Sequence, residues 1–336
     1  MKRLLRGRRG HAAVAAAGLG CSALFTYLAV RGVRLSEMGD ALRESNYWWL
    51  LPAFALLAAG NLLRGFRWQY LFAPETRPPY EPVVEAMLIG QFFNNVLPAR
   101  AGEAARIVYL NQQARTSRAE TVGTVISERA YDVLSVLLIL FVLLPWLPHV
   151  SWLRAAGILA IALTLGMVAA YVVLKAYHAR PARWLARKLA WLPFVDVERA
   201  ERAAENLVHG LAALRRPRLV FAAFFWTLAS WIVLGLSGWF LMRGFDLGLS
   251  PTAGMLVTVA AALGMILPSS PAAVGVFEAA VLVGLNPYHI PKPEALSYAL
   301  VLHALNFFPY IVVGASILAF RMRGLRVRPE VQAEQR

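Results

Sequence analysis

Cysteine, charged residues and nucleotide-binding motifs are all scarce in this chain. The single cysteine, Cys21, cannot form an intramolecular disulfide, and no cluster of cysteine and histidine has metal-ligand spacing. The sequence also has neither a Walker loop nor a Gly-x-Ser-x-Gly elbow. We therefore expect no metal, no cofactor, no enzyme active site of these kinds and no ATP-driven activity.

Charged residues make up only 16% of the 336 residues, whereas hydrophobic residues make up 59%. Several apolar runs reach about 20 residues, the length of a helix that crosses a bilayer. We expect one integral, all-α, polytopic membrane domain over 1–336. Two other interpretations of the first apolar run are a signal peptide and, at Gly18–Cys21, a lipoprotein cleavage box. The apolar run is longer than that of a signal peptide, and Gly18 stands where a lipoprotein cleavage box has Leu. We therefore expect an uncleaved helix.

The apolar runs predict six full crossings and two broken pairs between them. The crossings are 12–30, 47–65, 120–144, 153–175, 218–242 and 295–320, and the broken pairs are 83–97 with 101–113 and 252–267 with 272–285. Each pair is interrupted at a Leu-Pro, at Pro98 and at Pro268, 170 residues apart. Each arm is too short to cross alone, so each pair is predicted to be re-entrant, within 83–113 and 252–285. Interrupted segments at matching positions of two halves are typical of a transporter.

The distribution of Lys and Arg supports this layout. Of the 34 such residues, 27 fall on one predicted side, six on the other, and Arg129 lies within a helix. The asymmetry predicts that both termini are cytoplasmic. It also gives the halves, 47–145 and 218–320, opposite orientations, which is an inverted-topology repeat. We attribute the net charge of +15 to this bias and to attraction by anionic phospholipids, not to nucleic-acid binding.

A basic and aromatic segment over 178–217 is predicted to form a cytoplasmic hairpin. Its first part mixes Arg and Lys with Trp and Leu, as an interfacial amphipathic helix does. A cytoplasmic partner could dock on the more polar second part, although a solvated helix face is the simpler interpretation.

Polar residues cluster around the first break. Glu103 and Arg106 are three apart at the start of a short helix, where their side chains can pair, and Arg100 lies in the turn. Backbone freed there must line protein or water, and an anion could be held by free N–H groups and arginine. Asn94 and Asn95 suit sugar or headgroup hydroxyls. The alternatives are that Glu103 caps its own helix and that the asparagines cap the broken backbone.

The sequence Ser-Glu-Arg-Ala-Tyr-Asp places three ionisable residues near the middle of a predicted span. Glu128 and Asp132 are four apart, and Arg129 and Asp132 three apart, so they share a helix face. Ionisable groups at this depth are costly and mark functional sites. They would form an internal ion-pair lock, a proton-accepting site or a polar track for a headgroup. The alternative is a static salt bridge that stabilises the bundle.

Two further ionisable residues lie in the second half. Glu278 follows the second break and has no arginine near it in sequence, so a partner such as Arg129 or a bound cation is expected. Unpaired, it would carry a proton; alternatively, it faces an aqueous vestibule. His303 in the last helix is the weakest candidate, since a lone His on an apolar helix usually serves structure.

These motifs resemble the flippase-like membrane family that includes the transmembrane region of lysylphosphatidylglycerol synthases. The matching segments are Asn-Asn-Val-Leu-Pro-Ala-Arg-Ala-Gly-Glu-Ala-Ala-Arg106, Ser-Glu-Arg-Ala-Tyr-Asp132, Leu-Pro-Ser-Ser-Pro-Ala-Ala-Val-Gly-Val-Phe-Glu278 and Phe-Phe-Pro-Tyr-Ile-Val-Val-Gly314. The resemblance implies movement of an anionic, aminoacylated, glycosylated or polyprenyl-type lipid between leaflets of the bacterial inner membrane. The resemblance implies that the translocation site includes the charged residues within these segments: Arg100, Glu103, Arg106, Glu128, Arg129, Asp132 and Glu278.

Two departures from the family pattern are visible. No aminoacyl-transferase domain is present, so lipid synthesis is not implied, and His303 stands where the family usually has an arginine. We therefore expect a lipid flippase and not an enzyme, and the buried acids make coupling to a proton or a cation one option. A small-solute transporter, an intramembrane enzyme acting on a lipid headgroup and an accessory subunit are the alternatives. The sequence leaves open which lipid moves, in which direction it moves, what drives the movement and whether the protein forms a homodimer.

Overall fold

The computed structural model describes residues 18–97, 101–147, 158, 161–162, 165–166, 216–267 and 269–333. All regular elements in these ranges are helices, as expected of an all-α protein. They are the helix Gly18–Val30, α2 (Leu35–Glu44), η1 (Tyr47–Trp49), α3 (Leu50–Tyr70), α4 (Tyr80–Val96), α5 (Gly102–Ala114), α6 (Arg118–Leu143), η2 (Leu144–Trp146), α10 (Pro217–Gly244), α11 (Pro251–Gly264), η4 (Pro271–Ala273), α12 (Val276–Leu285), η5 (Asn286–Tyr288) and α13 (Lys292–Ala333).

Five helical segments of the described chain are long and apolar enough to cross a membrane. They are Tyr47–Tyr70, Glu120–Trp146, Pro217–Gly244, Pro271–Tyr288 and Lys292–Arg321. Four of them coincide with the predicted crossings 47–65, 120–144, 218–242 and 295–320. Of the other two predicted crossings, 12–30 is described only from residue 18, as a shorter apolar helix, and 153–175 lies almost entirely outside the described residues, as does the hairpin 178–217.

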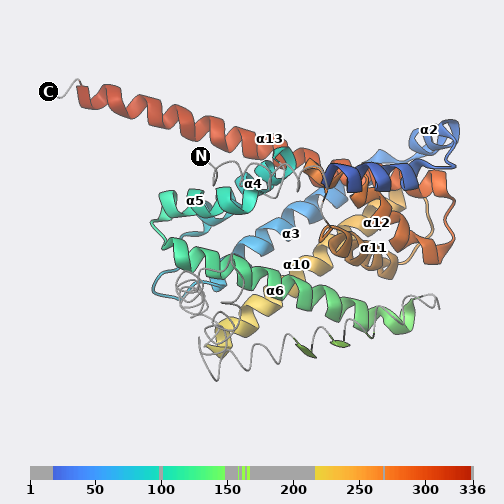
Figure 1. The fold of residues 1–336 in the computed structure, drawn as a ribbon, viewed down its shortest axis with the longest axis horizontal. Coiled ribbons are helices and arrows are strands. Elements are labelled where there is room, and N and C mark those ends of the chain that lie inside the picture. The colour runs from blue at the N-terminus through green and yellow to red at the C-terminus, as the bar shows by residue number, and fades with distance from the viewer. Residues whose placement is uncertain are drawn as a thin grey trace, which may run out of the picture.

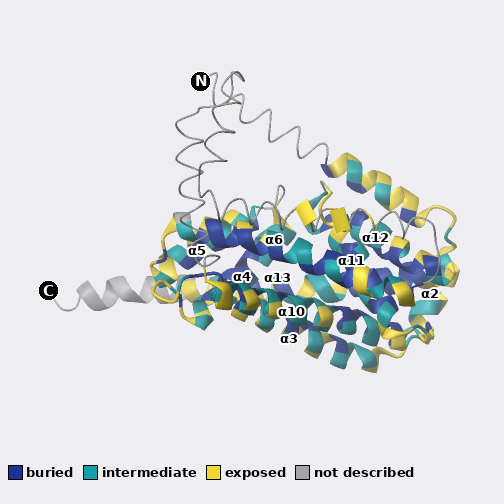
Figure 2. Cartoon of the chain, turned by 90° about the horizontal axis from the view of Figure 1, so that it is seen from below, coloured by how far each residue is buried: buried dark blue, intermediate teal, exposed yellow. Residues whose placement is uncertain are grey.

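Helices α3 and α10 pack along each other (Figure 1) and lie on one side of the bundle, at its lower edge in Figure 2. They are antiparallel: the Asn46 N–H, just before α3, donates to the Gly244 carbonyl at 2.8 Å, and at the opposite end Arg216 lies 2.8 Å from Glu75. That second pair is solvent-exposed, and the hydrogen bond from Arg216 lowers the pKa of Glu75. Pro217 at the first position of α10 starts the helix without losing a hydrogen bond.

The two predicted broken pairs form two helical hairpins. Helix α4 packs on α5, and α11 packs on α12. The first pair lies toward one end of the long axis and the second toward the other, in both views (Figures 1 and 2). Pro98 and Pro268 are outside the described residues, but α4 ends at Val96 and α11 at Gly264, just before them.

Each hairpin depends on a close approach at a glycine. A Cβ on Gly102 would overlap the Gly90 carbonyl of α4, and the Gly102 N–H donates to Asn94 Oδ1 at 2.9 Å. In the second hairpin, Gly275 has φ +82° and a Cβ there would meet the helix Gly18–Val30. Positive φ at Ala272 and Ala273 completes this turn, so the candidate span Pro271–Tyr288 is interrupted before α12 begins.

The outside of the helical bundle carries many large apolar side chains. Phe221 and Phe225 of α10 and Phe308 of α13 are examples that are more than half exposed. Exposed apolar surface on this scale marks a surface that contacts membrane. Buried residues line the interior between the helices (Figure 2), and the ionisable residues described next lie there.

Candidate functional site

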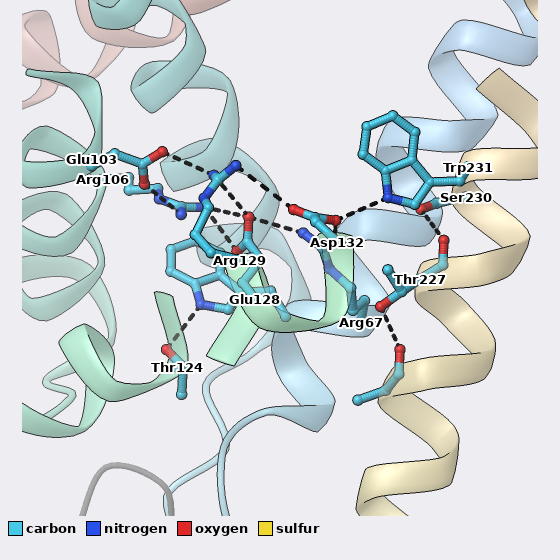
Figure 3. Close-up of polar contacts among 12 residues, drawn as sticks. Arg67, Glu103, Arg106, Thr124, Glu128, Arg129, Asp132, Thr227, Ser230 and Trp231 are labelled. Atoms are coloured by element: carbon cyan, nitrogen blue, oxygen red, sulfur yellow. Dashed lines mark hydrogen bonds and ion pairs between the residues drawn. The ribbon is translucent and has the colours of Figure 1, made fainter. Parts of the chain in front are cut away.

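Glu128 of α6 is the centre of a buried group of ion pairs. Its side chain is 4% exposed and accepts from three guanidinium groups: Arg67 Nη2 at 2.9 Å, Arg106 Nη1 at 2.9 Å and Arg129 Nη2 at 3.2 Å. Arg67 comes from α3, Arg106 from α5 and Arg129 from α6 itself (Figure 3). One carboxylate therefore joins three helices.

Two more carboxylates complete the charge balance. Glu103 contacts Arg106 at 2.5 Å and Arg129 at 2.9 Å. Asp132 pairs with Arg67, lies 3.6 Å from Arg129 and accepts a hydrogen bond from Trp231 Nε1 at 3.1 Å (Figure 3). We call the three arginines and three acids the ion-pair cluster: Arg67, Glu103, Arg106, Glu128, Arg129 and Asp132. Its formal charges cancel, which is what burial of ionised groups requires.

The cluster is buried at Arg67 of α3 and partly exposed at Arg129 of α6. Arg67 is 1% exposed, whereas Arg129 is 52% exposed. The predicted face of Glu128, Arg129 and Asp132 on one helix is therefore present, and Glu103 and Arg106 join it as well. Arg100 lies outside the described residues.

Arg67 is the member that the sequence interpretation missed. The predicted span ended at residue 65, so Arg64 and Arg67 were counted with the cytoplasmic charges, whereas α3 continues to Tyr70. Placing both arginines inside the helix corrects that count but leaves the sign of the Lys and Arg asymmetry unchanged. The available signal was their spacing: three apart, the two arginines share a helix face if the helix continues through them.

Glu278 has a partner in the last helix. Its Oε1 lies 2.5 Å from His303 Nδ1, and its Oε2 accepts from the Gly275 N–H at 2.7 Å. The expectation that Arg129 would pair with Glu278 is wrong: the side-chain partner among the described residues is His303, and Arg129 pairs with Glu103, Glu128 and Asp132. The other ring nitrogen, Nε2, lies 2.9 Å from the Ala272 carbonyl. Both ring nitrogens of His303 therefore face oxygen atoms, those of Glu278 and Ala272.

The two predicted asparagines have different surroundings. Asn94 Oδ1 accepts from the Gly102 N–H, so this side chain caps the broken backbone, one of the two alternatives. Asn95 donates to the Phe307 carbonyl at 3.5 Å and lines a cavity. Only Asn95 is therefore placed to meet a ligand within the described residues.

A cavity of about 210 Å³ lies between the two halves of the chain. We call it the central cavity. Its polar lining residues come from α3, α4, α10, α11 and α13: Arg64, Gln91, Asn95, Trp231, Thr258, His303, Asn306 and Tyr310. Trp231 connects the cavity with the ion-pair cluster, because its ring lines the cavity and its N–H donates to Asp132. His303 connects the cavity with Glu278.

The sequence matches known membrane proteins over most of its length. The family model described as "Lysylphosphatidylglycerol synthase TM region" matches residues 14–314. A curated relative, the UPF0104 membrane protein MJ1078 of Methanocaldococcus jannaschii, is 21% identical over 252 residues, which cover 71% of this chain and 98% of that protein. The matched range contains the whole ion-pair cluster, the Glu278–His303 pair and every residue that lines the central cavity.

Proposed function

We propose, from the premise that this chain belongs to the family of the lysylphosphatidylglycerol synthase TM region, that it moves a lipid between the two leaflets of the bacterial inner membrane. The headgroup would pass through the central cavity while the acyl chains stay in the bilayer. The observation that carries the proposal is a cavity walled by both halves of the chain, in which an arginine, amides and hydroxyls lie among apolar side chains, in a protein whose helices are long and apolar enough to cross a membrane.

The surface beside the cavity suits a lipid with its chains outside. Met265 lines the cavity and is itself 37% exposed, and Ile266 and Leu267, which follow it, are exposed as well. Polar lining and lipid-facing apolar surface therefore adjoin at the end of α11. A headgroup can enter the cavity there without drawing the acyl chains through protein.

The packing of the helices supports the inverted repeat that alternating access uses. Helix α3 is antiparallel to α10, α4 packs against α13, and α6 packs against α11. Exchanging the two halves leaves the α3–α10 contact in place and converts the α4–α13 contact into the α6–α11 contact. The hairpins α4–α5 and α11–α12 lie at opposite ends of the molecule (Figure 1), as two re-entrant pairs entering from opposite sides would.

We assign the ion-pair cluster the role of a lock on one side of the cavity. Its pairs link α3, α5 and α6, and Trp231 connects them to the cavity wall. Opening a path past α5 requires these pairs to break or to exchange partners. The half-exposed Arg129 is the member best placed to leave the cluster and contact an anionic headgroup.

The test is lipid movement in proteoliposomes that carry NBD-labelled phospholipids, with dithionite reduction reporting the accessible leaflet. We expect the purified chain to expose inner-leaflet lipid to dithionite, and Arg129→Gln to slow this step at least tenfold. Arg216→Gln is the matched control, since Arg216 is equally exposed, 51% against 52%, and pairs with an acid outside the cluster. Absence of lipid movement in monodisperse wild-type protein, or an equal rate in Arg129→Gln, would contradict the proposal.

A further inference from the structure

Arg64 is a cation without an acidic partner in the wall of the central cavity. Its guanidinium carbon lies 4.7 Å from the centroid of the Trp231 ring, and its buried Nε has no hydrogen-bond partner. None of the ion pairs of the described residues includes it, and Asp132 and Glu128 act on it only from longer range. Arg67, one helical turn further along α3, is in contrast paired with both of those acids.

Apart from His303, which pairs with Glu278, the rest of the polar lining consists of amide, hydroxyl and indole groups. The Gln91 amide makes no hydrogen bond, and the side-chain oxygens of Asn95 and Asn306 accept none, among the residues that the structure describes. No carboxylate lines the cavity in this part of the chain. Two acids lie behind the wall: Glu278 uses both oxygens for His303 and the Gly275 N–H, and Asp132 accepts from Arg67 and from Trp231.

The cavity therefore offers one guanidinium without an acidic partner, the unpaired amide of Gln91 and the unused side-chain oxygens of Asn95 and Asn306, and such a lining selects a ligand by its charge and its hydrogen-bonding groups. A phosphodiester would meet Arg64, which gains most from an anionic acceptor. Sugar or glycerol hydroxyls would meet the amides. A primary amine would enter beside a cation with no free carboxylate to pair with it, and like charges in a desolvated site repel strongly.

We propose that the central cavity binds the phosphodiester of an anionic lipid whose remaining headgroup is an uncharged polyol or sugar, with Arg64 on the phosphate, and that it discriminates against aminoacylated headgroups. This assignment rests on the proposed function. The cavity, at about 210 Å³, is smaller than the ~300–1,000 Å³ of pockets that enclose drug-sized ligands. It therefore fits a headgroup, with the acyl chains outside.

Trp231 is a positioning residue for Arg64. The indole ring lies under the guanidinium and attracts it by a cation–π interaction. The indole N–H donates to Asp132, which fixes the ring plane (Figure 3). Trp231→Phe retains an aromatic ring but loses this donor, so it tests positioning separately from charge.

The binding experiment uses the full chain in mild detergent and native mass spectrometry with four probes: phosphatidylglycerol, lysylphosphatidylglycerol, monoglucosyl diacylglycerol and soluble glycerophosphoglycerol. We expect phosphatidylglycerol to bind at least tenfold more tightly than lysylphosphatidylglycerol. Arg64→Gln should weaken phosphatidylglycerol binding about 10- to 100-fold, because a hydrogen-bonded charge is lost. Arg64→Lys should recover part of it, and Trp231→Phe should weaken binding less than Arg64→Gln does.

Arg243→Gln is the control, because Arg243 also lies over a tryptophan ring, that of Trp49, but on the exposed surface. Equal binding by wild type and Arg64→Gln, or lysylphosphatidylglycerol bound as tightly as phosphatidylglycerol, would overturn the assignment. Glycerophosphoglycerol binding at the lipid's affinity would support the phosphate site but show that the source is a soluble solute. Lipid movement that persists in Arg64→Gln would refute this inference alone, whereas selective binding without any lipid movement would refute only the proposed function.

Discussion

Replacing Glu128 with Gln tests whether the ion-pair cluster is a single buried unit. The substitution keeps the shape and one acceptor oxygen but removes the charge that Arg67 and Arg106 share. Both arginine side chains are at most 6% exposed, so solvent cannot replace the lost carboxylate. Each retains a second acid, Asp132 for Arg67 and Glu103 for Arg106.

The magnitude follows from these contacts. Removing one partner of a buried ion pair costs about 3–5 kcal/mol, whereas an ordinary hydrogen bond between transmembrane helices averages about 0.6 kcal/mol. Because Gln retains an acceptor and each arginine retains an acid, we expect the lower end of the ionic range. The free energy of unfolding of Glu128→Gln should therefore fall by about 3 kcal/mol, roughly a 100-fold change in the folded-to-unfolded ratio.

The assay is reversible unfolding by sodium dodecyl sulfate in mixed micelles, followed by far-ultraviolet circular dichroism. Glu75→Gln, which breaks the exposed pair with Arg216, is the matched control and should leave the transition unchanged. In a double-mutant cycle, Arg106→Gln and Glu128→Gln together should cost about 1–3 kcal/mol less than the sum of the two. A loss below about 1 kcal/mol for Glu128→Gln, with no coupling to Arg106→Gln, would refute the reasoning.

Three further substitutions test the packing around the site by the same unfolding assay. Gly102→Ala should destabilise by about 1–3 kcal/mol because the new methyl overlaps a carbonyl of α4, whereas Gly20→Ala, which has open space, should be neutral or stabilising; equal effects would contradict the close approach. Tyr298→Phe should cost about 1 kcal/mol, since its buried hydroxyl donates to a carbonyl of α10 at 3.0 Å, and a wild-type transition would refute that bond. Glu278→Gln should cost about 1.5–3 kcal/mol by removing the carboxylate partner of His303. If His303→Gln is equally costly and the double variant is no less stable than either single variant, the two residues act as one pair; additive costs would contradict this.

The placement of the helices was largely predictable from sequence. Runs of apolar residues near 20 long have few alternatives to spanning helices, and a proline after an apolar run, as at Pro98 and Pro268, predicts where a helix stops. Helices α4 and α11 end within a few residues of the predicted positions. Positive φ at Ala272 and Ala273 was not predictable, because nothing in an alanine favours that conformation.

The partners of the charged residues were only partly predictable. Pairs three or four apart on one helix, such as Arg129 with Asp132, follow from helical geometry. Pairs between helices, such as Arg67 with Glu128 and Glu278 with His303, depend on how helices pack, which residue types alone do not fix. The positive-inside rule assigns arginines near the end of a span to the cytoplasm, so it does not identify Arg64 and Arg67 as residues inside the helix.

The most direct measurement of the central claim is lipid movement after the central cavity has been filled. Ala262 of α11 lines the cavity, whereas the adjacent Leu263 is 36% exposed on the outside of the same helix. In the dithionite assay, Ala262→Phe should abolish lipid movement while Leu263→Phe retains the wild-type rate, provided that both variants elute as monodisperse protein. Equal rates in the two variants would show that the headgroup does not pass through this cavity.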